Sequence, residues 1–186
     1  MAGAAEICLM DDKDGLIGAS WMTEAPDDGS MGMAIIQGLQ ARENEMKRDN
    51  KAIVRGFADE VITQGKIEAA GQYVWEDVVE QVPMPGQGPG LDGLKDVVRA
   101  MRTGFPDLVF SVEEQIAEDD KVVSRFEWTG THRGEFLGIP ATGRPVRVWG
   151  MVIDRLVEGR IKDTRILMDT LGLMGQLGAL PAPPEA

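Results

Sequence analysis

The hydrophobic period of this chain changes once, near residue 107, from the spacing of helices to that of strands. Before that point, apolar residues recur at helical intervals in 53–62 and 94–101. After it, four segments alternate apolar and polar residues: 108–114, 121–129, 146–157 and 160–168. Because helices come first and a run of strands follows, we predict an α+β fold, a cone-shaped barrel with N-terminal helices packed on a curved antiparallel sheet.

Polar residues and a glycine-rich loop mark the ends of these segments. Asp49 or Asn50 is expected to cap the first helix, and Asp169 or Thr170 to cap the last one. Residues 73–82 are predicted to form a strand, or a passage from helix to strand, and the loop PMPGQGPG, rich in proline and glycine, follows.

The first 47 residues differ from the rest. They hold six of the eleven methionines, many glycines and scattered acids, without a sustained period of either kind. We expect residues 1–47 to form an extension that is loose or acts as a lid, residues 48–181 to form the folded domain, and residues 182–186 to be a tail.

The net charge and the scarcity of cysteine and histidine limit the kinds of partner and metal site that the protein can have. A formal net charge of −12 disfavours nucleic acid and anionic membrane surfaces as partners. Cys8 and His132 are the only cysteine and histidine, which leaves poor ligands for zinc or iron. The sequence has no secretory signal, no run of 18 apolar residues and no phosphate-binding glycine loop. We therefore predict a cytoplasmic protein without metal or cofactor.

Four stretches recur in the order found in one family: GLDGLKDVVRAMRTGFPDL, KVVSRFEWTGTHRGEFLGIPATGRPV, DRLVEGRI and MDTLGLMGQLG. Over residues 48–181 the chain resembles the SnoaL-like polyketide cyclases, which have the nuclear-transport-factor-two-like fold. The resemblance implies an apolar pocket inside the cone and aldol-type chemistry in which an aspartate and a histidine move protons without a cofactor. Laid on this sequence, those two positions fall at Ile166 and Val152, which are aliphatic.

Asp154 is the nearest candidate to replace them. Side chains alternate along a strand, so Asp154 shares the face of Val152, and this face is the pocket side if the register holds. A carboxyl group there has a raised pKa, which suits a general acid or base. The alternative is a solvated strand end where Asp154 pairs with Arg155 or Arg147.

Arg125 and Glu127 share one face of their strand, and Phe126 and Trp128 share the other. If the first face is inside, Arg125 can hold an enolate and Glu127 can transfer a proton, an arrangement that resembles epoxide hydrolases of this fold. The alternative is a salt bridge on the outer face, since alternation does not reveal which face is inside.

The remaining candidates have a weaker basis. His132, in the GTH motif, is a candidate acid or base because its ordinary pKa is near neutrality, but loop carbonyls often satisfy such a histidine. Further substrate-binding candidates, most of which are also compatible with a structural role, are Glu80, Tyr73, Trp128, Trp149, Val152 and Ile166.

We therefore predict an acid/base lyase, cyclase or isomerase that acts on a hydrophobic, oxygenated aromatic or polyketide-like small molecule. A non-catalytic binding protein and an epoxide hydrolase are the alternatives. The outer face of the sheet must also be covered, and strand residues such as Arg147, Met151 and Ile153 are expected to form a homodimer there.

Overall fold

The structure is a computed structural model that describes residues 30–180, so residues 1–29 and 181–186 lie outside the described part. The chain divides into two units, Met1–Gln40 and Ala41–Ala186. Of the first unit, only 30–40 are described, and they are helical. The tail at 182–186 and most of the segment expected to be loose or lid-like therefore stay predictions.

The first helix is longer than expected. Helix α1 spans Ser30–Gly56 and continues as a π-helix, η1, over Phe57–Thr63. The predicted cap at Asp49 or Asn50 was wrong, because both residues lie inside α1. Residues 35–48 lack an apolar stripe but are rich in glutamine, glutamate, lysine, arginine and alanine, which favour helices by intrinsic propensity.

The sheet has five strands in the order β1-β5-β4-β3-β2. Neighbouring strands run antiparallel except β1, which is parallel to β5. The α+β class is confirmed, although the sheet is mixed rather than wholly antiparallel and does not close into a barrel. The strands are β1 Val74–Glu80, β2 Val109–Glu118, β3 Lys121–Thr131, β4 Pro145–Val157 and β5 Arg160–Met168.

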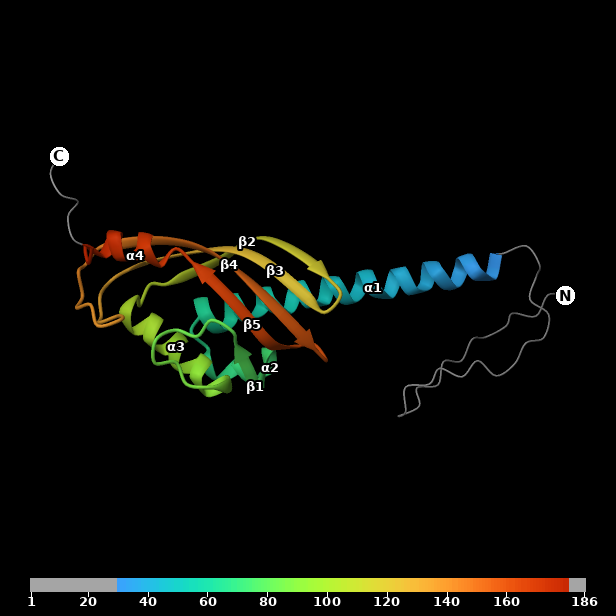
Figure 1. Ribbon diagram of the computed structural model, residues 1–186, viewed down its shortest axis with the longest axis horizontal. Helices are drawn as coiled ribbons and strands as arrows, with labels where there is room; N and C mark the ends of the chain where they lie inside the picture. The colour runs from blue at the N-terminus through green and yellow to red at the C-terminus, as the bar shows by residue number, and fades with distance from the viewer. Residues whose placement is uncertain (1–29, 181–186) are drawn as a thin grey trace. The chain divides into compact units, whose positions relative to one another are not determined.

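Two further helices pack on the sheet (Figure 1). Helix α3, Gly90–Gly104, contacts β1, and helix α4, Thr170–Leu177, contacts β4. The predicted cap of α4 is confirmed, since the Asp169 carboxylate accepts a hydrogen bond from the Gly172 amide at 2.8 Å. Short helical turns, η2 Ile67–Ala69 and α2 Ala70–Tyr73, lead into β1. Within 30–180, no helix is long and apolar enough to cross a membrane.

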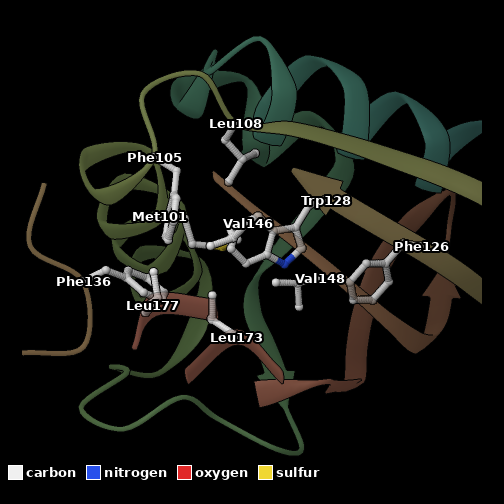
Figure 2. Close-up of a cluster of buried hydrophobic side chains, with 10 residues drawn as sticks. All are labelled: Met101, Phe105, Leu108, Phe126, Trp128, Phe136, Val146, Val148, Leu173 and Leu177. Atoms are coloured by element: carbon white, nitrogen blue, oxygen red, sulfur yellow. The ribbon is translucent and has the colours of Figure 1, made fainter. Parts of the chain in front are cut away.

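The main core lies on the face of the sheet that carries α3 and α4. Its side chains come from α3, β3, β4, α4 and the segments between them, and they point toward one another (Figure 2). Gly150 makes this packing possible, because a β-carbon there would lie 2.4 Å from the Phe126 ring of the paired strand. Phe126 and Trp128 are therefore inside, and the residues that alternate with them on β3, Arg125, Glu127 and Thr129, belong to the other face.

Candidate functional site

An apolar cavity opens between the sheet and the helices η1 and α3. Its volume is about 130 Å³, close to the roughly 150 Å³ of an engineered cavity that accepts benzene. Aliphatic, aromatic and methionine side chains form most of the wall, including Phe110, Phe126, Trp128 and Met168. The cavity therefore has the size and polarity to hold one ring of a hydrophobic molecule.

Asp154 lies in this cavity, on the face predicted from strand alternation. Its side chain is 5 % exposed. The pKa of Asp154 is raised to about 7, chiefly by burial and in addition by the nearby Glu80 and Asp163 carboxylates, whereas a hydrogen bond from Thr164 opposes the rise. A carboxyl group that is half protonated near neutrality can either give or accept a proton. The alternative of a solvated strand end does not hold.

The two aliphatic positions implied by the resemblance also face the cavity. Val152 and Ile166 are paired across β4 and β5, and both line the wall. Asp154 is paired with Thr164 in the adjacent row of the same face. The cavity thus presents a carboxyl group one row away from the two positions at which the resemblance to the cyclases implies an aspartate and a histidine.

Two further candidates lie at the cavity. Trp128 lines it from β3 and is buried. Glu80 lines it from the end of β1, and burial raises the pKa of this carboxyl group.

Arg125 and Glu127 are not part of this site, which corrects the inward arrangement considered above. They lie on the outer face of β3, where Arg125 pairs with Glu113 and Glu127 accepts a hydrogen bond from Arg147 at 2.6 Å. Phe126 and Trp128 fill the inner face because their rings exclude water there. The epoxide-hydrolase arrangement therefore has no basis in this structure.

His132 is also outside the cavity wall. It is completely buried, its ring stacks on Phe105 with the centroids 5.1 Å apart, and Nδ1 lies 3.1 Å from the Thr142 hydroxyl. These contacts fix the loop that follows β3 and keep the ring from the cavity. Of the two ring nitrogens, only Nδ1 has a partner among the described residues, Thr142 of the same loop, and Nε2 is buried without one, so the expected loop carbonyls do not satisfy this histidine.

Tyr73 and Trp149 lie elsewhere as well, against the substrate-binding prediction. The Tyr73 hydroxyl donates a hydrogen bond to Glu60 at 2.6 Å, and its ring packs edge-on against Phe57. Trp149 is 53 % exposed on the outer face. It precedes Gly150 on β4, which faces inward, and successive side chains on a strand point to opposite faces.

Thr164 and Ser124 are buried polar residues of the cavity wall that the sequence analysis missed, and Thr164 is the one beside the carboxyl groups. It is buried, it lines the cavity, and it is paired with both Asp154 and Glu80. Thr164 lies two positions before Ile166 on β5, so strand alternation alone could have placed it on the same face as Ile166. No sequence pattern indicated that β1 lies parallel beside β5. Within 30–180, no cluster of three or more potential metal ligands is present.

Comparison with known proteins identifies the family and agrees with the fold. The model of the SnoaL-like polyketide cyclase family matches residues 52–177, whereas the search of curated proteins gives no match. TsrD from Streptomyces laurentii is 27 % identical with a TM-score of 0.67, and the alignment covers 72 % of this chain and 98 % of TsrD.

Two further similar structures are proteins proposed to be polyketide cyclases. The one from Acidithiobacillus ferrooxidans is 28 % identical with a TM-score of 0.63, and 72 % of this chain and 96 % of that one are covered. IdmH from Streptomyces antibioticus is 28 % identical with a TM-score of 0.61, and the covered shares are 69 % and 98 %.

Proposed function

The chain belongs to the SnoaL-like polyketide cyclase family, and we propose on that basis that it is an acid/base enzyme that needs no cofactor. Its proposed substrate is a hydrophobic, oxygenated aromatic or polyketide-like molecule. The reaction is aldol or retro-aldol chemistry, ring closure, or dehydration, all of which pass through an enol or enolate and include proton transfer at the carbon beside a carbonyl group. The observation that carries the proposal is the buried Asp154 carboxyl in an otherwise apolar cavity.

The test uses a simple ketone in place of the unidentified substrate. In β-tetralone, an aromatic ring of the size of the cavity adjoins a C–H group beside a carbonyl. We expect the protein to accelerate exchange of that hydrogen for deuterium in D₂O, measured by NMR. An exchange rate equal to that of buffer, together with tight binding of the ketone, would instead support the second candidate.

That second candidate is a ligand-binding protein of the same fold without catalysis. The aliphatic pair Val152 and Ile166 favours it, because neither side chain can transfer protons. The two candidates differ in turnover and not in binding, so the exchange experiment separates them.

We expect the activity to be independent of metal ions. The catalytic group proposed here is a carboxyl group that acts on protons directly, so no Lewis acid is required. Dialysis against a chelator should leave the rate of β-tetralone exchange unchanged. A loss of rate that an added divalent ion restores would contradict this prediction.

The outer face of the sheet is proposed to bind a second copy of the chain. Leu167, Met151, Ile153 and Trp149 are exposed on adjacent strands there, and Leu167 is 75 % exposed. The double variant Leu167→Lys, Met151→Lys should be a monomer, because dimer formation would bury the two new charges of each chain in an apolar contact. Leu171→Lys, an exposed change on α4, is the control. Analytical ultracentrifugation makes the measurement, and a wild-type monomer at micromolar concentration would refute the proposal.

A further inference from the structure

Glu80 and Asp154 belong to one row of side chains across the sheet. Thr164 on β5 is paired with Asp154 of β4 on one side and with Glu80 of β1 on the other. All three side chains line the cavity. Since neighbouring strands lie about 4.8 Å apart, the two acidic residues are separated at the backbone by about 10 Å. A ring-sized molecule between them is within reach of both carboxyl groups.

These two residues are the only charged ones among those that line the cavity, and no lysine or arginine faces them there. The charge of Glu80 raises the pKa of Asp154, and so does that of Asp163, which pairs with Arg155. Two carboxylates in an apolar space resist ionising together. At neutral pH the pair is therefore expected to hold one proton and one negative charge.

The surroundings of the two groups decide where that proton resides. The Glu80 carboxylate accepts hydrogen bonds from the backbone amides of Val82, at 2.9 Å, and Ile166. Asp154 is more deeply buried and accepts one from Thr164. Hydrogen bonds from amides stabilise the ionised form, so the negative charge of the pair is expected on Glu80 and the proton on Asp154.

A second cavity of about 340 Å³ adjoins the first at Glu80. Its wall consists of the end of β1 and the loop 83–90, and four residues line both cavities: Glu80, Gln87, Leu94 and Thr164. Glu80 thus stands between a small inner chamber and a larger outer one. The outer chamber brings the available space into the usual range of ligand sites, roughly 300–1,000 Å³.

We propose that Glu80 is a second catalytic carboxyl group, which removes a proton from the carbon beside a carbonyl while Asp154 gives its proton to the carbonyl oxygen. This inference rests on the proposed function and deepens it. The electron pair of the C–H bond becomes the new C=C bond, and the carbonyl π electrons take the proton from Asp154. The products are an enol, neutral Glu80 and ionised Asp154, and the total charge is unchanged. The substrate is a ketone with one apolar ring in the inner chamber and its remainder in the outer one.

The first test compares rates of β-tetralone exchange. Glu80→Gln keeps the acceptor for the backbone amides but removes the base, and we expect the rate to fall about 100-fold. Glu80→Asp keeps the carboxylate, but the shorter side chain holds it farther from the substrate, so exchange should also be slow in this variant. The double variant Glu80→Gln, Asp154→Asn should be no slower than the slower single variant, because both groups act in one step. In the wild-type protein the rate should fall as pH rises through about 7, where Asp154 loses the proton it donates.

The second test does not depend on activity. Carboxyl ¹³C NMR should show that Glu80→Gln shifts the titration midpoint of Asp154 to lower pH, because a neighbouring negative charge is gone. Glu127→Gln, which removes a carboxylate from the outer face, should leave that midpoint in place. A merely structural role of Glu80 predicts no such shift.

The outcomes separate this inference from the proposed function. If Glu80→Gln exchanges β-tetralone at the wild-type rate while Asp154→Asn is inactive, Asp154 acts alone and the second carboxyl group is refuted. An unchanged Asp154 midpoint in Glu80→Gln also overturns the pair. If the wild-type protein gives no exchange, the proposed function fails and the catalytic pair fails with it, even where the titrations are coupled.

Discussion

Asp154→Asn is expected to lower the rate of β-tetralone exchange at neutral pH by about 100-fold or more. The substitution keeps the shape of the side chain and removes its titratable proton. Asp154 is buried in the apolar cavity with its pKa raised to about 7, so a large fraction of the molecules hold the proton near neutrality. An amide in the same place binds the ketone but cannot transfer that proton. The measurement is the exchange rate in D₂O, with ketone binding recorded in parallel.

Two matched variants on the outer face serve as controls. Glu127→Gln makes the same kind of change on β3, and Arg125→Met removes the charge beside it. Both side chains point away from the cavity, so both variants should exchange β-tetralone at the wild-type rate. A fully active Asp154→Asn combined with an inactive Glu127→Gln would place the chemistry on the other face and refute the site described above.

The stability of the protein should depend on pH through the same residue. Folding raises the pKa of Asp154 from its ordinary 3.8 to about 7, so the folded state holds a proton that the unfolded state has lost over this window. Its contribution to the free energy of unfolding therefore falls as pH rises from about 4 to about 7. The full difference corresponds to about 4 kcal/mol, an upper value that relaxation of the site reduces.

Comparison with Asp154→Asn isolates this contribution from those of other groups. The two proteins should have similar stability near pH 4, where Asp154 is neutral in both states, and the variant should be the more stable at pH 8. Urea unfolding across this range makes the measurement, and Glu127→Gln should follow the wild-type curve within about 1 kcal/mol, as expected for an exposed ion pair. If the difference in the free energy of unfolding between wild type and Asp154→Asn does not change with pH, then folding does not raise the pKa of Asp154, and this prediction is wrong.

The sequence by itself determined the class of the fold and the parity of each strand. Alternation of apolar and polar residues is a local property, because successive side chains on a strand point to opposite faces. It therefore placed Asp154 on the same face as Val152, and Phe126 with Trp128. The cap at Asp169 is equally local, since its carboxylate bonds an amide three residues away.

Only the tertiary structure decided which face of β3 is inside and which residues share the cavity. Alternation gives two faces of β3 that are equally regular, and packing of Phe126 against Gly150 chooses between them. The row of Glu80, Thr164 and Asp154 depends on β1 lying parallel beside β5. That pairing joins residues 84 to 87 positions apart in the chain. No local pattern specifies it, because its free energy comes from the burial that the whole fold creates.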